Sequence, residues 1–176
     1  MWGNLKICCT FAADSTEKQD MLANTFIGSI EAKTDEKGRI FVPASYRRIL
    51  NEMGEKRIIM RRDTDNACLI FYPESVWNRK VNELKSALDE WDADDQMLLM
   101  QFVAEAECLE TDAQGRVLMQ KRNQQLIGAK QDVVFVGMMD RFALWAPEGY
   151  AQKSVSSEEL ANRIRQKIAQ TRKTIQ

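Results

Sequence analysis

Two arginines that each follow a tight turn are the residues of this sequence best suited to chemistry. Arg39 ends the run Asp35-Glu-Lys-Gly-Arg39, and Arg116 ends the run Asp112-Ala-Gln-Gly-Arg116. In each run the aspartate can accept hydrogen bonds from backbone N–H groups, and the glycine supplies the conformation that the turn needs. Neither job requires a long cation at the next position. A guanidinium there can pair with phosphate, or read the O6 and N7 atoms of guanine in the major groove of DNA.

Composition excludes several other kinds of chemistry. The 176 residues contain no histidine, so Ser-His-Asp and Cys-His catalysis and His-ligated metal sites are ruled out. No phosphate-cradling GxxxxGK[ST] loop is present, so an enzyme is the weakest interpretation. The apolar stretches fall far short of the ~18–20 residues that span a membrane. We therefore expect no cofactor, no metal, no small-molecule substrate and no membrane partner.

The cysteines give no sign of a metal site either. The four of them show no CxxC spacing: Cys8, Cys9, Cys68 and Cys108. Zinc sites need paired ligand spacing, which is missing here. We interpret Cys68 and Cys108 as small buried apolar residues in a reducing compartment.

Charge is distributed unevenly along the chain. The sequence carries 25 Lys and Arg against 26 Asp and Glu, a formal net charge of −1 that predicts no general attraction to polyanions. Residues 33–62, however, contain nine cations and four anions, whereas residues 83–95 contain one lysine and six acidic residues. A basic side and an acidic side on one molecule suit a protein that meets the DNA backbone with a single face.

The turns belong to a longer internal repeat. The segment 34–40 recurs 77 residues later as 111–117, and the segment 54–74 recurs 74 residues later as 128–148. The three residues missing from the second copy lie between the arginine and the next glycine. We therefore expect the helix there to be shorter by about one turn.

Each copy is predicted to run β-β-α-β-β. In the first copy, Pro43 opens the helix and Gly54 closes it. The expected strands are 30–34, 39–42, 57–60 and 68–71, with a helix over 44–53, and in the second copy 117–119, 133–136 and 142–145. Half a core of this size is marginal alone, so the copies should pack into one α+β, barrel-like unit with a pseudo-twofold axis. Such an axis would place Arg39 and Arg116 on one face.

Helices are predicted between and after the copies. One apolar stripe, interpreted as core packing, comprises Trp77, Val81, Leu84, Leu88 and Trp91, and Asp94-Asp95 should cap a second helix through Phe102. The tail begins with a capping box at Ser156 and Glu159 and places Leu160, Ile164 and Ile168 at four-residue steps. We expect it to dock on the body or on a neighbouring subunit. Its basic face is either solvated or a further contact with nucleic acid.

With these motifs in order, the chain resembles the MraZ family of bacterial transcriptional regulators, which have two SpoVT-AbrB-type swapped-hairpin repeats. The resemblance covers about residues 21–150. Its matching segments are Phe26-Ile-Gly28, Asp35-Glu-Lys-Gly-Arg39, Ile40-Phe-Val-Pro-Ala-Ser-Tyr-Arg47, Asp112-Ala-Gln-Gly-Arg116, Asp132-Val-Val-Phe-Val-Gly137 and Arg141-Phe-Ala-Leu-Trp145. The resemblance implies binding to short direct DNA repeats upstream of the division and cell-wall gene cluster, repression there, and assembly into a ring-shaped homo-oligomer. It also implies a cytoplasmic, nucleoid-associated protein.

The resemblance carries residue roles with it. The resemblance implies a DNA contact by Lys37, Arg39, Gln114 and Arg116, and the turn-forming residues that orient them are Asp35, Gly38, Asp112 and Gly115. From the basic segment 33–62 we also expect Lys33 and Arg47 to bind DNA. The second copy departs from the first, with Met119-Gln120 in place of Val42-Pro43 and Gln124 in place of Arg47. We therefore expect the first repeat to attract phosphate more strongly.

The predicted domain organisation has five parts. They are an extension over 1–20, SpoVT-AbrB repeats over 26–76 and 103–150, a helical connector over 77–102, and an amphipathic basic helix over 151–176. The extension is expected to be either a disordered segment or the product of a mis-called start, with Met21 as the biological start. One alternative stays open: the repeats could form an oligomeric protein-interaction scaffold without specific DNA binding. A gel shift on the protein's own upstream DNA would separate the two.

Overall fold

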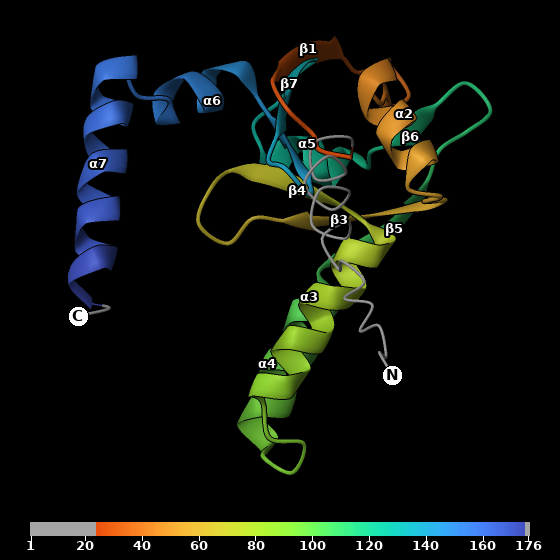
Figure 1. The fold of residues 1–176 in the computed structure, drawn as a ribbon. Coiled ribbons are helices and arrows are strands. Elements are labelled where there is room, and N and C mark those ends of the chain that lie inside the picture. Colours follow the sequence, from red (N-terminus) through yellow and green to blue (C-terminus); the bar gives the residue numbers. More distant parts are fainter. Residues whose placement is uncertain (1–23, 175–176) are drawn as a thin grey trace, which may run out of the picture.

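The computed structural model describes residues 24–174 (Figure 1). The expected extension over 1–20 and the proposed start at Met21 lie outside the described residues. Each copy runs β-β-α-β-β as predicted, and every strand pair among the described residues is antiparallel, so the fold is α+β.

Six strands form one sheet in the order β1-β7-β8-β4-β3-β5. Their bounds are β1 Ser29–Lys33, β3 Arg57–Arg62, β4 Cys68–Pro73, β5 Ala106–Glu110, β7 Asp132–Gly137 and β8 Phe142–Trp145. The remaining two strands, β2 Arg39–Phe41 and β6 Arg116–Leu118, pair with each other as a separate ribbon.

The two repeats exchange strands. The first strand of repeat one, β1, pairs with β7 of repeat two, and the corresponding strand of repeat two, β5, pairs with β3 of repeat one. The ribbon likewise joins one strand from each repeat. The expected barrel is not found, because β1 and β5 are opposite edges of an open sheet among the described strands.

A hydrophobic core with an aromatic cluster inside it lies between the ribbon and the large sheet. Phe71 and Phe142 stack with ring centroids 5.2 Å apart, and Phe26 and Tyr46 pack edge to face at 5.2 Å. The ribbon contributes Ile40 and Val117, which point inward and are almost fully buried. Because strand side chains alternate between faces, the neighbours of these two residues must point outward.

A short helix follows each ribbon strand. In repeat one α2 spans Ala44–Glu52, and in repeat two α5 spans Lys121–Leu126. The prediction of a shorter second helix is confirmed. The helices end before Gly54 and Gly128, whose φ angles of 71° and 68° lie in the left-handed region that favours glycine.

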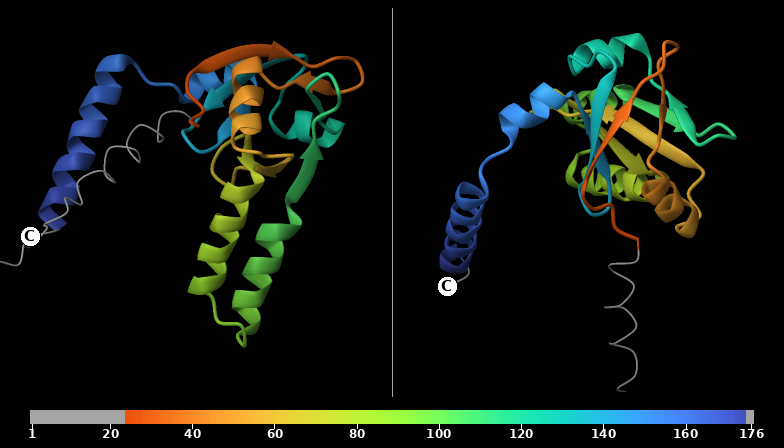
Figure 2. Two further views of the ribbon diagram at one scale, coloured as in Figure 1. Left: turned by 45° about the vertical axis from the view of Figure 1, so that its right-hand side comes forward. Right: turned by 90° about the horizontal axis from the view of Figure 1, so that it is seen from above.

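The connector forms a helical hairpin of α3, Glu74–Ala87, and α4, Ala93–Ala104, that extends away from the sheets (Figures 1 and 2). Trp77 is buried and stacks on Phe102 at 5.3 Å. The single-stripe prediction is wrong for Trp91, which is 93% exposed in the turn between the helices. The expected cap at Asp94-Asp95 is wrong by at least two residues, because the Asp92 side chain accepts the capping hydrogen bonds from the Asp94 and Asp95 N–H groups.

The C-terminal region contains two helices rather than one, α6 over Pro147–Lys153 and α7 over Ser157–Thr174. At the start of α7, Ser156 Oγ accepts a hydrogen bond of 3.2 Å from the Glu159 N–H, as half of the predicted capping box. Helix α7 stands apart from the sheets in Figures 1 and 2, so the expected docking on the body of the same chain does not occur. No helix within residues 24–174 is both long and apolar enough to cross a membrane.

Candidate nucleic-acid interface

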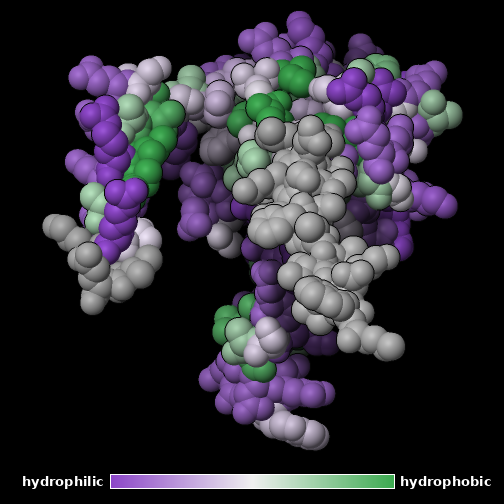
Figure 3. Space-filling view, viewed as in Figure 1, coloured by the Kyte–Doolittle hydropathy of each residue, from purple (hydrophilic) through white to green (hydrophobic). Residues whose placement is uncertain are grey.

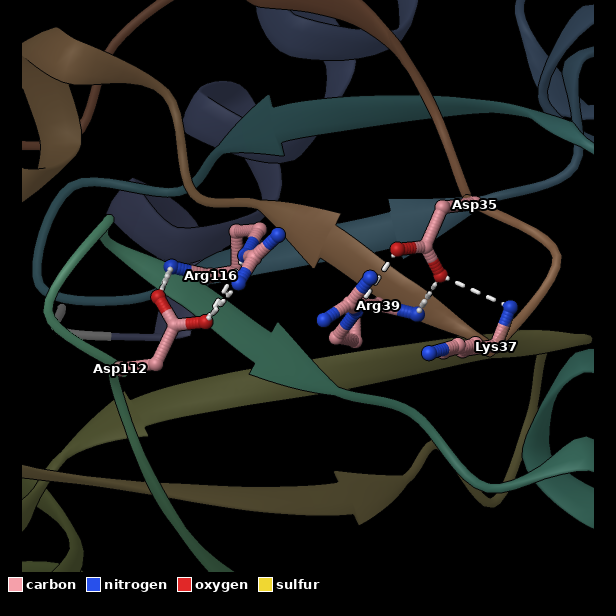
Figure 4. A network of polar contacts seen from close by, with 5 residues as sticks. All are labelled: Asp35, Lys37, Arg39, Asp112 and Arg116. Atoms are coloured by element: carbon pink, nitrogen blue, oxygen red, sulfur yellow. Dashed lines mark hydrogen bonds and ion pairs between the residues drawn. The ribbon is translucent and has the colours of Figure 1, made fainter.

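The ribbon presents both arginines on one outward face. In the antiparallel register Arg39 lies opposite Leu118, and Phe41 lies opposite Arg116. Directly opposed residues point to the same side, and so do residues two apart on one strand. Figure 4 shows the two guanidinium groups side by side above this face. Phe41 and Leu118, the cross-strand partners of Arg116 and Arg39, are more than half exposed on the same face.

One aspartate holds each turn and its arginine. Asp35 Oδ1 accepts hydrogen bonds from the N–H groups of Lys37, at 2.9 Å, and Arg39, at 2.8 Å. Asp35 Oδ2 accepts a third from Arg39 Nε at 2.7 Å. A guanidinium has five N–H donors, so this pairing leaves others for a further acceptor. The aspartate thereby aims the arginine without using up its donors.

The second turn repeats this arrangement. Asp112 Oδ1 accepts from the N–H groups of Gln114, at 2.9 Å, and Arg116, at 3.0 Å. Asp112 Oδ2 accepts from Arg116 Nε at 2.7 Å (Figure 4). The side chains of Lys37 and Gln114 stand at the exposed tips of the two turns.

Both carboxylates are held in the charged form. The hydrogen bond from the Arg39 backbone N–H is the largest cause that lowers the pKa of Asp35 from 3.8. The hydrogen bond from the Arg116 side chain is the largest cause that lowers the pKa of Asp112, to about 2. Each site therefore presents an ion pair at neutral pH, in which the carboxylate orients the cation.

Each turn is braced by the other repeat. The Gly38 carbonyl accepts a hydrogen bond from Met119 N at 2.9 Å, and the Gly115 carbonyl accepts one from Val42 N at 3.1 Å. Both glycines have positive φ, 79° and 77°. Each turn is therefore hydrogen-bonded to the partner repeat, and the pairing of the two ribbon strands places the arginines relative to each other.

Side chains from the opposite repeat also support each turn, and Arg47 is one of them. It is on α2 of repeat one but packs under the turn of repeat two, where a Cβ on Gly115 would come within 2.5 Å of its Cδ. Its Nε donates to the Val42 carbonyl at 3.1 Å, and the side chain is half-buried. Gln124 takes the matching place under the first turn, 3.1 Å from where a Cβ on Gly38 would stand. These positions hold the ribbon in place.

Lys33 lies off the ribbon. It is the last residue of β1, and its Nζ stands 3.4 Å from Asp132 Oδ1 on the adjacent strand β7. The structure thus gathers the predicted residues Asp35, Lys37, Gly38, Arg39, Asp112, Gln114, Gly115 and Arg116 around the ribbon, with Arg47 beneath it and Lys33 outside it.

Sequence reasoning missed Phe41 and Leu118 on this face and the bracing place of Gln124. For the first two, a signal was present. Ile40 and Val117 alternate with them on short strands, and an inward residue implies an outward neighbour. The position of Gln124 depends on packing between repeats, which the sequence does not display.

The basic character of residues 33–62 is reduced by folding. Three of its nine cations pair with carboxylates from elsewhere in the chain: Lys33 with Asp132, Arg57 with Glu74, and Arg61 with Glu105. Surface pairs of this kind contribute little to stability but do cancel local charge. Folding therefore leaves this segment less basic than its composition indicates.

The cysteines within the described residues are unpaired. Cys68 is buried, and burial raises the pKa of its thiol to about 12. The prediction that Cys108 is also buried is wrong, because it lies exposed on the edge strand β5. Within residues 24–174, no three Cys, Asp or Glu side chains cluster so as to hold a metal ion.

Comparisons with known proteins agree with this arrangement of two repeats. A family model described as "MraZ protein, putative antitoxin-like" matches residues 25–100 and 102–172. A Transcriptional regulator MraZ of Bacteroides thetaiotaomicron is 42% identical over 134 residues, covering 76% of this chain and 86% of the relative. Proteins of the same name from Bacteroides fragilis and Shewanella oneidensis are 44% and 30% identical, covering 70% and 80% of this chain and 78% and 95% of those proteins. The chain therefore belongs to the MraZ family.

Proposed function

We propose that this protein is a transcriptional regulator that binds double-stranded DNA with the outward face of the β2–β6 ribbon. The observation that carries the proposal is the pair of aspartate-held arginines, Arg39 and Arg116, on one exposed face. The names of the relatives, each a transcriptional regulator, support the same conclusion.

The ribbon suits the major groove. A two-stranded β-ribbon fits the groove, and an arginine can make a bidentate contact with guanine that contributes ~1–3 kcal/mol of discrimination. Phe41 and Leu118 are exposed beside the arginines, where an apolar side chain can meet a thymine methyl group. Lys37 at the turn tip is placed for phosphate, whereas Gln114 offers an uncharged hydrogen bond. Asp35 and Asp112 orient the arginines, and Arg47 acts beneath the turn as a positioning residue.

The finer proposal follows the family resemblance. We propose that the two repeats, over 26–76 and 103–150, are SpoVT-AbrB-type swapped hairpins, which the strand exchange of β1 and β5 supports. Several subunits of a ring would bind tandem direct repeats upstream of the division and cell-wall genes and repress them. One ribbon offers few cations, so the ring would gain affinity through effective concentration. This activity belongs in the cytoplasm, at the nucleoid.

The test is a quantitative gel shift on the DNA upstream of the protein's own coding region. Arg39→Ala/Arg116→Ala should lower specific affinity on the order of 100-fold or more, because two guanine contacts are lost. Arg48→Ala is the matched control, since Arg48 is exposed on α2 and pairs with Glu52 away from the ribbon. Circular dichroism must show all three proteins folded. Undiminished affinity in the double variant would refute the site.

The salt dependence and the alternative function are read from the same assay. Specific binding should weaken steeply between low and physiological salt, because phosphate contacts release counterions. If the wild-type protein binds its upstream DNA no better than unrelated DNA, the interaction-scaffold alternative is favoured. That alternative draws on the exposed apolar and charged surfaces of the helices, which are independent of the ribbon.

A further inference from the structure

A recess lies beneath the turn of repeat two, where this turn meets α2 of repeat one. Its volume is about 190 Å³, and its walls come from both repeats: α2 and the loop after it on one side, and residues 111–115 on the other. Figure 3 shows mostly hydrophilic side chains over these elements, at the upper right. None of the four outward-facing ribbon residues lines the recess, so the proposed contact with DNA does not use it.

Two cations of the recess, Arg47 and Lys56, form no ion pair with any described residue. Arg47 uses Nε for the Val42 carbonyl, at 3.1 Å, which leaves the N–H donors of its other two nitrogens. One of these nitrogens, Nη1, lies 2.5 Å from the place that a Cβ on Gly115 would occupy. The guanidinium therefore reaches the turn because residue 115 has no side chain. Lys56 is exposed, so its ammonium group is reached from solvent.

The carboxylates that line the recess are already engaged. Asp112 uses both oxygens within its own turn, and Glu55 Oε1 accepts a hydrogen bond of 3.2 Å from the Ser75 N–H at the start of α3. Asn51 and Thr111 add an amide and a hydroxyl group to the walls. The recess therefore offers more free donors than free acceptors, which suits an anion that accepts hydrogen bonds from several directions.

The matching place under the turn of repeat one differs in two charges. Gln124 stands where repeat two is supported by Arg47, and Glu36 stands where Ala113 lines the recess. Repeat one thus lacks a cation and gains a carboxylate. Its turn also faces the shorter helix α5, with six residues against nine in α2. The features that attract an anion therefore belong to the turn of repeat two alone.

We propose that the recess binds a small free ligand through a phosphoryl group, and that this ligand weakens DNA binding. A phosphate monoester carries about −1.5 to −2 charges at neutral pH and has three acceptor oxygens. These match the two cations and the two neutral donors of the recess, whereas a carboxylate carries a single charge. The volume lies below the ~300–1,000 Å³ of pockets for drug-sized ligands, so the body attached to the phosphoryl group is small.

The regulatory half of this proposal rests on the proposed function. A phosphoryl group in the recess adds negative charge beside the turn that holds Arg116, and it engages Arg47, which supports that turn. Its charge repels the phosphates of DNA at the ribbon. By linkage, ligand and DNA each lower the affinity for the other by the same factor. The ligand would therefore release the regulator from its site.

Isothermal titration calorimetry of the full chain with inorganic phosphate, at constant ionic strength, tests the site without DNA. One phosphate should bind per chain, and acetate should bind more weakly. Lys56→Gln should lower the affinity for phosphate about 10-fold or more, because a charged hydrogen bond is lost. Lys130→Gln changes the matching lysine of repeat two and should leave the affinity unaltered. Ala113→Glu copies Glu36 of repeat one and should abolish binding by like-charge repulsion. Circular dichroism of each variant controls for folding.

Fluorescence anisotropy with labelled upstream DNA then measures the coupling. At constant ionic strength, saturating phosphate should weaken DNA binding by the wild-type protein about 5-fold or more. In Lys56→Gln, the phosphate concentration that gives half of this effect should rise by the same factor that calorimetry finds. In phosphate-free buffer Lys56→Gln should bind DNA as well as the wild-type protein does, because its ribbon is intact.

Several outcomes would overturn the proposal. A wild-type protein that binds no phosphate, or equal affinities in folded Lys56→Gln and Lys130→Gln, would refute the site. Weaker DNA binding by Lys56→Gln in phosphate-free buffer would refute the free ligand, because the recess would then hold a phosphate of the DNA backbone. DNA affinity that ignores bound phosphate would refute the regulatory half. A failure of the wild-type protein to bind specific DNA would count against the proposed function alone, since the calorimetry contains no DNA.

Discussion

The turn of repeat one and the turn of repeat two have the same internal hydrogen bonds but different surroundings. The bonds from the two backbone N–H groups and from arginine Nε to the aspartate agree within 0.2 Å. The turn tips differ, with Lys37 in the first and Gln114 in the second. The braces also differ, since Gln124 supports the first turn and Arg47 the second.

The arginines themselves are unequally covered. The Arg39 side chain is 34% exposed and that of Arg116 only 19%. The register explains the difference: Arg116 lies opposite Phe41, whose ring centre is 5.6 Å from its guanidinium carbon, whereas Arg39 lies opposite Leu118, which has no ring. The Asp and Gly residues therefore determine the shape of each turn, whereas the cross-strand neighbour determines the solvent exposure of each arginine side chain.

The largest expected difference between the turns concerns their glycines. A Cβ on Gly38 would meet the Met119 backbone oxygen at 2.6 Å, whereas the three atoms nearest to a Cβ on Gly115 all belong to the Arg47 side chain. Both substitutions cost about 1–2 kcal/mol for a left-handed conformation, and Gly38→Ala adds a backbone clash. Gly38→Ala should therefore lose more than about 2 kcal/mol of unfolding free energy in urea melts, and Gly115→Ala less.

Repeating both glycine substitutions in an Arg47→Ala background separates the clash with the Arg47 side chain from the clash with the Met119 backbone. Removing the Arg47 side chain should relieve the clash in Gly115→Ala, and should do nothing for Gly38→Ala. If the two glycine variants lost the same unfolding free energy in both backgrounds, the expected difference between the Gln124 and Arg47 supports would be contradicted.

Next in size is the contribution of the turn tips to DNA binding. Lys37→Ala should reduce the slope of log affinity against log salt by about one phosphate contact, whereas Gln114→Ala should leave the slope unchanged. Gln114→Lys should raise the slope of the second turn toward that of the first. Gel shifts at a series of salt concentrations measure this, and identical slopes for both alanine variants would remove the expected asymmetry.

A smaller effect concerns the residue before each short helix. Pro43 has φ −50° and ψ 140°, and Gln120 at the matching place has φ −63° and ψ 147°. Because the backbone already suits proline, Gln120→Pro should stabilise the protein by about 0.4–1 kcal/mol through loss of unfolded-state entropy. Thermal melts against wild type provide the measurement, with Lys121→Pro as a control in the first turn of α5. Destabilisation by Gln120→Pro would show that the two helix starts are less alike than their angles.

The smallest expected effect is acid titration of the two aspartates. The folded-state pKa of Asp112 is about 2 and that of Asp35 is below 3.8, both depressed. Their contribution to stability is therefore complete above the unfolded-state pKa and is lost as the pH falls toward the folded-state values. Carboxyl NMR titration should give the lower pKa for Asp112, and Arg116→Ala should raise it toward 3.8. An unchanged pKa in that variant would contradict the ion-pair assignment.

Much of the fold could be predicted, since it depends on local chemistry. The glycine turns, the alternating strands and the shorter second helix follow from residues within a few positions of each other. The prediction for Trp91 failed because a helical stripe says nothing about where a helix ends. Helix α3 stops at Ala87, and Trp91 falls in an exposed turn. Cys108 was misjudged similarly, since its strand lies at a sheet edge.

By itself, the sequence determined that two turns of the pattern Asp-x-x-Gly-Arg exist and that each would point an arginine out of a hairpin. Only the tertiary structure decided that the strands of those turns pair with each other, that Arg47 supports the opposite repeat, and that Lys33 is matched by Asp132. The physical reason is the sequence separation over which each kind of interaction acts. Turn and helix preferences act between neighbours along the chain, whereas strand partners, braces and ion pairs are chosen among residues that only folding brings together.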